Sequence, residues 1–467
     1  MSSGPDRAKV DAAAGQVPGY SPTPRVRRLS LGLGLPNKRW RFFLLYCLET
    51  LFAYGYVILR GARPGFWVGP HDFTSFYTGA LMLRQGLGSR LYDLAAQAQV
   101  QQALLRPYGW VFADGLLPYI YPPFLAVLFV PLTWVSLQWA FILWNLANLA
   151  LIITTVALLL AQWRRLSPGY LAISTVIALA FIPVFQGVRN GQSSFLVLLA
   201  LTLTYVAQAK KHEALSGLAL AFGLIKPQLV VLFVLWLLVR RRWRALLAFG
   251  AAAIALLFVS CGITGSDGLM AYLPLTRQML AWDGRYGIYP AVMPNLRGTV
   301  VRLSHLHQAW QGSPPSTLAT MLANVLFALP ILWLLFLGWR TSRQGSMGAE
   351  DLCFAQTISA GLLLSPHLYG HDLSLLVLGG FLLTRRLLAA GRLRAAWRVT
   401  VLGHAGLFVS VYLGMDWQAQ VGMLLLLGLM VFTQMELASQ HRSDVAANTA
   451  TQSVPPRDPG SAEGRPE

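Results

Sequence analysis

The chain has 467 residues, of which 55% are hydrophobic and only 12% are charged, and its mean hydropathy is +0.53. Because soluble domains carry about 25% charged residues, this composition excludes an ordinary soluble protein and predicts an all-α polytopic membrane protein. The formal net charge of +19 would suit a nucleic-acid binder, but the placement of the basic residues argues against one.

In chain order, residues 1–38 form a polar, basic tail, residues 39–440 form the membrane domain, and residues 441–467 have the composition of a disordered tail. The break at Lys226-Pro227 predicts broken helices that line a cavity. The apolar segments lie near residues 40–60, 121–138, 139–162, 170–187, 192–208, 214–225, 228–239, 244–262, 317–339, 352–366, 371–388, 397–414 and 417–436.

Lys and Arg cluster in the N-terminal tail and in the short connections that follow alternate segments, for example Arg164-Arg165, Lys210-Lys211 and Arg240-Arg241-Arg242. The positive-inside rule places these clusters and both termini in the cytoplasm of a multi-pass protein of the bacterial inner membrane. About twelve crossings result if residues 121–136 dip into the membrane without crossing, or lie at its interface. The outer, periplasmic face then receives residues 61–120, 189–194, 225–228, 264–316 and 365–372.

The cysteines Cys47, Cys261 and Cys353 lie inside apolar runs and lack CxxC spacing, so they predict packing rather than redox or metal chemistry. Neither GxGxxG nor a P-loop occurs, and we expect no cofactor and no bound metal.

The stretch DFTSFYTGA places Asp72 in the first predicted outer loop. A carboxylate just outside a helix end suits a general base, and sugar transfer to a hydroxyl needs one such base. When the leaving group is a lipid phosphate, cations and hydrogen-bond donors replace the second, acidic carboxyl of glycoside hydrolysis. Such groups in the outer segments are Arg189, Lys226, Arg285, Arg297, His367 and His371.

Six motifs occur in a fixed order, and together they resemble glycosyltransferase family 87, the bacterial polyprenyl-phosphate-mannose-dependent mannosyltransferases of the GT-C superfamily. The motifs are DFTSFYTGA, LYD at 91–93, YPPF at 121–124, RNGQSSFL at 189–196, GLIKPQ at 223–228 and SPHLYGHDL at 365–373. The resemblance covers most of residues 40–390 and implies a GT-C membrane fold, here with re-entrant or interfacial and periplasmic loop helices.

The resemblance also assigns site residues. The family's catalytic acid falls on Asp72, its Lys-Pro element on Lys226 and Pro227, and its late Ser-Pro…His element on Ser365, Pro366 and His371. This chain departs from the family in SPHLYGHD, where many members carry a Trp and a His-rich run.

The predicted site has Asp72 as general base, and the following groups as ligands. Lys226, His371 and Arg189 bind the donor phosphate, and Tyr77, Asn190, Gln192 and His367 bind the sugar or acceptor. Structural alternatives stay open for the charged residues. Asp72 and Asp93 would each cap a helix, Lys226 would pair with a buried acid such as Glu49, and His367 with His371 has the i, i+4 spacing of metal ligands.

The predicted function is transfer of a hexose, mannose by resemblance, from a polyprenyl-phosphate donor to a glycan or glycolipid acceptor, with inversion. The reaction would take place on the outer face of the membrane, among membrane lipids and with no nucleic-acid partner. A transporter or flippase of lipid-linked sugars and a glycan polymerase or ligase are the alternatives; no convincing internal repeat favours a transporter.

Overall fold

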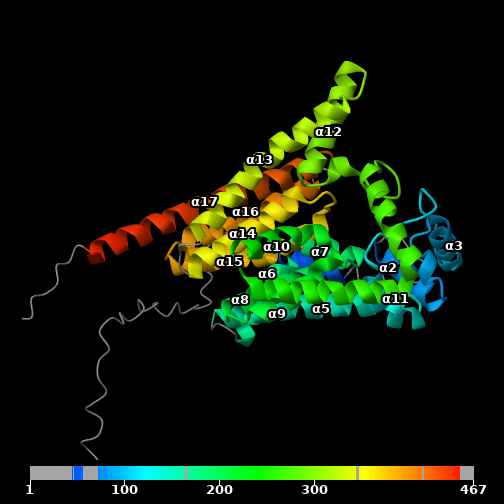
Figure 1. The fold of residues 1–467 in the computed structure, drawn as a ribbon, viewed down its shortest axis with the longest axis horizontal. Coiled ribbons are helices and arrows are strands. Elements are labelled where there is room, and N and C mark those ends of the chain that lie inside the picture. Colours follow the sequence, from blue (N-terminus) through cyan, green and yellow to red (C-terminus); the bar gives the residue numbers. More distant parts are fainter. Residues whose placement is uncertain are drawn as a thin grey trace, which may run out of the picture. The chain divides into compact units, whose positions relative to one another are not determined.

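The computed structural model describes residues 45, 47–55, 72–163, 167–342, 347–412 and 415–452, which are almost entirely helical (Figure 1). Within these ranges, extended pairing is limited to one isolated bridge between Arg285 and Ile288. The all-α prediction is therefore confirmed for the described part of the chain. His71 and the rest of residues 56–71 lie outside it.

After a helical stretch at 47–55, the elements follow in chain order. The first half comprises α2 (Asp72–Arg84), α3 (Leu94–Leu105), α4 (Pro123–Phe129), η3 (Val130–Trp134), α5 (Leu137–Gln162), α6 (Pro168–Leu179), α7 (Ile182–Asn190), α8 (Ser194–Ala209), α9 (Glu213–Phe222) and α10 (Val231–Val239). The second half comprises α11 (Trp243–Ala281), α12 (Leu296–Gln311), α13 (Thr317–Ser342), α14 (Met347–Leu364), η7 (Gly370–Leu375), α15 (Leu376–Ala389), α16 (Leu393–Tyr412) and α17 (Met415–Gln452). Further 3₁₀ turns are η1 (Gly88–Arg90), η2 (Arg106–Tyr108), η4 (Gly223–Ile225), η5 (Pro227–Leu229) and η6 (Pro290–Val292).

Four described helices are long and apolar enough to cross a membrane, namely Leu137–Gln162, Trp243–Ala281, Thr317–Thr341 and Val421–Arg442. Helices α6 and α7, bent by 75° at their junction, would make a fifth if they form one span. Leu247 and Phe258 on α11 are each 74% exposed, as lipid-facing side chains are. The chain is thus a multi-pass membrane protein, and the count of twelve crossings stays a prediction.

Several predicted segments are short helices. Residues 123–134 form α4 and η3, which together reach roughly 18 Å and so fall short of a bilayer core of about 30 Å. The predicted interruption at Lys226-Pro227 is confirmed: α9 ends at Phe222, two 3₁₀ turns follow, and α10 begins at Val231. Lys226 itself lies between those turns with φ −130° and ψ 78°.

Two neighbouring groups of helices organise the fold. Helix α9 packs against α8 and α11, and α5 packs against α8, while α14 and α17 pack against each other and against α13 (Figure 1). Contacts between aromatic rings pack helix α2 against α5 and α4. Phe73 meets Phe141 edge-on at 5.4 Å between ring centroids, and Phe76 stacks on Phe129 at 5.0 Å.

Two buried glutamines of α3 hold the irregular segment before α4. The Gln97 side chain exchanges hydrogen bonds with the backbone of Tyr119, and Gln101 does the same with Leu117. Because each amide satisfies both an N–H and a C=O, this segment stays extended without a sheet partner.

The predicted outer loop 264–316 is mostly helical. Helix α11 continues past the expected end at 262, bends where Gly265 has φ 72°, and ends at Ala281. The residues after the bend include Leu, Met, Ala and Gln, which favour helix. Helix α17 likewise continues to Gln452, into the Ala-containing start of the segment predicted to be disordered from 441. Residues 453–467 lie outside the described ranges.

Candidate active site

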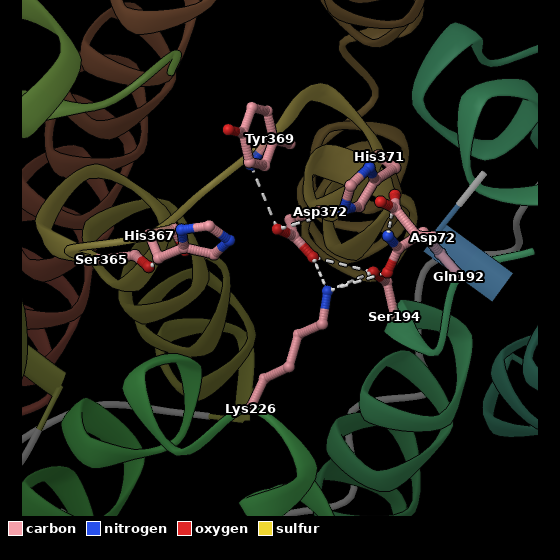
Figure 2. A network of polar contacts seen from close by, with 9 residues as sticks. All are labelled: Asp72, Gln192, Ser194, Lys226, Ser365, His367, Tyr369, His371 and Asp372. Atoms are coloured by element: carbon pink, nitrogen blue, oxygen red, sulfur yellow. Dashed lines mark hydrogen bonds and ion pairs between the residues drawn. The ribbon is translucent and has the colours of Figure 1, made fainter. Parts of the chain in front are cut away.

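Residues far apart in the sequence meet around a cavity of about 340 Å³ (Figure 2). Asp72 comes from the start of α2, Gln192 from the turn before α8, and Lys226 from the break between α9 and α10. The cavity lining also includes His367, Tyr369, His371 and Asp372 from the connection between α14 and α15. Four of the predicted site residues, Asp72, Gln192, Lys226 and His371, are thus brought together with a fifth, His367.

Asp72 is the first residue of α2, and its side chain is partly exposed to the cavity. The Gln192 side-chain amide donates a hydrogen bond to its Oδ2 atom (Figure 2). Burial raises the pKa of Asp72 to about 6, and the Gln192 hydrogen bond and the Lys226 charge oppose this shift. A carboxylate with such a pKa is ionised at neutral pH and basic enough to accept a proton.

The turn between α7 and α8 positions Gln192 through Gly191. Gly191 ends α7 with φ 63°, a conformation that favours glycine. A Cβ at this position would lie 2.7 Å from the Cβ of Phe73. The Gly191 carbonyl accepts a hydrogen bond from the Trp144 indole at 2.9 Å. The backbone can therefore approach α2 closely enough for Gln192 to reach Asp72.

Lys226 is 4% exposed and its ammonium group has three oxygen partners (Figure 2). It forms an ion pair with Asp372, donates to Ser194 Oγ at 3.0 Å, and lies 3.4 Å from Gln192 Oε1. The Tyr121 ring lies 6.0 Å away. Gln192 therefore bridges Asp72 and Lys226.

The alternative in which Lys226 pairs with a buried acid is confirmed, but the acid is not Glu49. Asp372 is the partner, and Glu49 is exposed on the helix at 47–55. Depth in an apolar segment suggested Glu49, but the helix turns that side chain outward, whereas Asp372 is only 1% exposed.

Asp372 organises the connection between α14 and α15. One oxygen, Oδ1, accepts from Lys226 and from Ser194 Oγ at 2.8 Å, and Oδ2 accepts from the Tyr369 backbone N–H at 3.2 Å. Residues 370–375 form the 3₁₀ helix η7, so His367 and His371 do not lie one α-helical turn apart. His371 Nε2 is 3.6 Å from Asp372 Oδ2, and burial lowers the pKa of His367 to about 4, which keeps His367 neutral at pH 7.

A second cavity, of about 310 Å³, shares Asp72, Tyr369 and His371 with the first. Arg189 and Asn190, at the end of α7, line this second cavity and not the first. Arg189 is exposed and lines a different cavity from Lys226. The sequence predicts that both residues bind the donor phosphate.

Other candidates have structural contacts. Tyr77 is 4% exposed, donates to the Val135 carbonyl at 2.8 Å and lines neither of the two cavities. Arg297 donates to the Pro366 and Leu280 carbonyls, and Arg285 is exposed over the Tyr286 ring. Asp93 caps α3 through Ala95 N and Ala96 N, as predicted.

Sequence reasoning missed Ser194, Tyr369 and the role of Asp372 as the partner of Lys226, whereas Tyr121, which the sequence suggests as either a lipid-interface anchor or a cavity wall, does line the first cavity. The three missed residues lie within the motifs RNGQSSFL and SPHLYGHDL, so the motifs located the segments but did not distinguish their members. In the part of the chain that the structure describes, no group of three or more His, Cys, Asp or Glu side chains is arranged to hold a metal ion.

Comparison with known proteins connects this site to a family. Residues 119–366 match the model of glycosyltransferase family 87. The chain is also similar to the polyprenol-phosphate-mannose-dependent alpha-(1-2)-phosphatidylinositol pentamannoside mannosyltransferase of Mycobacterium tuberculosis (strain CDC 1551 / Oshkosh), with 26% identity over 300 residues. That match covers 61% of this chain and 64% of the relative, less than two thirds of the relative's length. No solved structure matches the chain.

The family match includes Gln192 and Lys226, whereas Asp72, His371 and Asp372 lie outside its limits. It spans more than half of the chain, and four of the described helices are long and apolar enough to cross a membrane. The chain is a membrane protein that belongs to glycosyltransferase family 87.

Proposed function

We propose that this chain transfers mannose from a polyprenyl-phosphate donor to a hydroxyl of a glycan or glycolipid acceptor, with inversion at the anomeric carbon. One observation carries the proposal: Asp72 and Lys226 face the same cavity and are bridged by Gln192. A base and a buried cation held at one cavity suit a reaction in which a hydroxyl loses a proton and a phosphate departs.

In the proposed reaction, Asp72 accepts the proton of the acceptor hydroxyl as its oxygen attacks the anomeric carbon. The bond from that carbon to the phosphate oxygen breaks, and the electron pair leaves with the lipid phosphate. Lys226 stabilises the departing charge, and His371 adds a hydrogen bond. The close contact between Lys226 and Asp372 supports this role, because it holds the ammonium in place before the donor binds.

Donor and acceptor would approach Asp72 from different sides. The first cavity contains Lys226 and is proposed for the donor phosphate, with Gln192 and His367 beside the sugar. The second cavity contains Arg189 and Asn190 and is proposed for the acceptor. Asp72 belongs to both cavity linings, as a base acting between the two substrates must.

We further propose a GT-C-type fold with about twelve crossings, an inner-membrane location, cytoplasmic termini and an active site on the periplasmic face. The support is the distribution of Lys and Arg, which concentrates in the connections assigned to the cytoplasm.

The test is sugar transfer in membranes that contain the protein, supplied with labelled polyprenyl-phosphate-mannose and a glycolipid extract. We expect Asp72→Asn to lower transfer by roughly 10²- to 10⁴-fold, the usual contribution of a general base. Asp93→Asn is the matched control, because Asp93 is also an acid of the predicted first outer loop but lines neither cavity. Full transfer by a normally inserted Asp72→Asn variant would refute the role of Asp72.

The Arg189→Gln variant tests whether the two cavities bind different substrates, because Arg189 lines only the second cavity. We expect it to raise KM for the acceptor and to leave KM for the donor unchanged. A raised donor KM would return Arg189 to the donor phosphate, and would contradict the placement of the acceptor in the second cavity.

A further inference from the structure

The turn between α8 and α9 and the turn between α10 and α11 lie at the helix ends that are remote from Lys226. Both turns have an unusual backbone conformation. Lys211, between α8 and α9, has φ 61°, and Arg241, between α10 and α11, has φ 53°. In both turns the next N–H bonds to a carbonyl five residues back, from His212 to Ala207 at 2.8 Å and from Arg242 to Leu237 at 2.9 Å. This helix ending normally has glycine at the left-handed position.

A third turn of the same type shows the usual choice. Between α15 and α16, Gly391 has φ 70°, and the N–H of Arg392 bonds to the Leu387 carbonyl at 2.8 Å. Lys211 and Arg241 therefore occupy, in their turns, the left-handed position that Gly391 occupies in the third turn. Backbone strain of this kind in non-glycine residues is concentrated at functional sites.

Lys211 and Arg241 line one cavity, of about 820 Å³, together with Arg244 at the start of α11. All three side chains are exposed, and none has an ion-pair partner among the described residues. The acid at this cavity, Glu213, is held by Arg242 at 2.8 Å. The cavity therefore has three cations whose charges are not balanced by a carboxylate of the part of the chain that the structure describes.

Apolar side chains adjoin these cations. Trp243 and Leu215 also line the cavity, and each is 56% exposed. Cations beside an exposed tryptophan match a lipid headgroup, whose phosphate needs hydrogen-bond donors and whose glycerol and upper acyl region need an apolar contact. A free inorganic phosphate would use the cations alone.

We propose that this cavity binds the phosphate of an anionic phospholipid headgroup through Lys211, Arg241 and Arg244. The site is separate from the cavity of Asp72 and Lys226. Helix α8 joins the two regions: Ser194 at its start contacts Lys226, and Lys210 follows its last residue, so its 16 residues separate them by roughly 24 Å. The proposal is thus independent of the transfer reaction.

The test is the thermal unfolding midpoint of the full-length protein in a neutral detergent, titrated with dioctanoyl phosphatidylglycerol. Dioctanoyl phosphatidylcholine and inorganic phosphate are titrated in parallel. We expect phosphatidylglycerol to raise the midpoint saturably and phosphatidylcholine to have little effect. Equal shifts from both lipids would overturn the proposal. A full shift from inorganic phosphate at the same concentrations would overturn the lipid as the source of the phosphate.

The decisive variant is Lys211→Gly combined with Arg241→Gly. Because glycine favours the conformation of both turns, this variant keeps the fold while it removes two cations. We expect its apparent affinity for phosphatidylglycerol to be weaker by about tenfold or more, as loss of two charge-assisted contacts implies. Lys210→Gln is the matched control, since Lys210 is the neighbouring cation and does not line the cavity. Unchanged affinity in the double variant, or equal loss in the control, would refute the site.

Discussion

Lys226 and Asp372 form an ion pair in which both side chains are almost fully buried, although 146 positions separate them in the chain. Burial of two charges is costly unless each has further hydrogen-bond partners, and here Ser194 serves both. The pair connects the break between α9 and α10 with the start of η7, and so joins two segments that supply Lys226, His367, His371 and Asp372 to the first cavity.

Asp372→Asn is expected to destabilise the protein strongly, by about 3–5 kcal/mol, because it leaves the Lys226 ammonium buried without a counter-charge. Unfolding of the purified protein in detergent measures this. The Lys226→Met/Asp372→Leu double variant removes both charges, and we expect it to be more stable than the single variant. If the double variant is equally unstable or worse, packing rather than charge explains the loss.

The pH dependence of transfer should report the ionisation of Asp72. The base must be ionised, and its pKa is raised to about 6, so activity should be present above that pH and fall as pH drops through about 6. Gln192→Leu removes a hydrogen bond that favours the ionised form, and should therefore move the acidic limb of kcat/KM to higher pH. A limb that stays in place in Gln192→Leu would show that this hydrogen bond does not tune the base.

Gly191→Ala should destabilise the protein by about 1 kcal/mol or more, because alanine disfavours φ 63° and its Cβ would meet Phe73 at 2.7 Å. Transfer should fall as well, since Gln192 follows directly. Gly250→Ala is the control. Gly250 lies in α11 with open space around it, so alanine there should be neutral or stabilising by up to about 1 kcal/mol. Similar unfolding midpoints for the two variants would contradict this account.

Tyr77→Phe tests the placement of a residue that the sequence predicts to bind sugar. The variant loses the hydrogen bond to the Val135 carbonyl, which should cost about 1 kcal/mol of stability. Because Tyr77 lines neither cavity, KM for donor and acceptor should not change. An increase in either constant would place Tyr77 at the substrates after all.

The sequence alone determined the class of fold and the segments of the site. Composition and apolar runs predict a helical membrane protein because backbone groups in a bilayer must bond within the segment. The break at Lys226-Pro227 can be predicted from the sequence because proline cannot continue a helix. The helix cap at Asp93 can be predicted because it depends on hydrogen bonds to backbone N–H groups two and three residues later. These features depend on residues a few positions apart.

The tertiary structure decided the partnerships. Asp372 rather than Glu49 neutralises Lys226, and Arg189 belongs to a different cavity from Lys226. The sequence also does not show the direction in which Tyr77 points: DFTSFYTGA places it close to Asp72 in the chain, but its hydroxyl donates to the carbonyl of Val135, the residue after η3. Side-chain direction depends on helix phase and packing between distant elements, and no local pattern in this sequence encodes either.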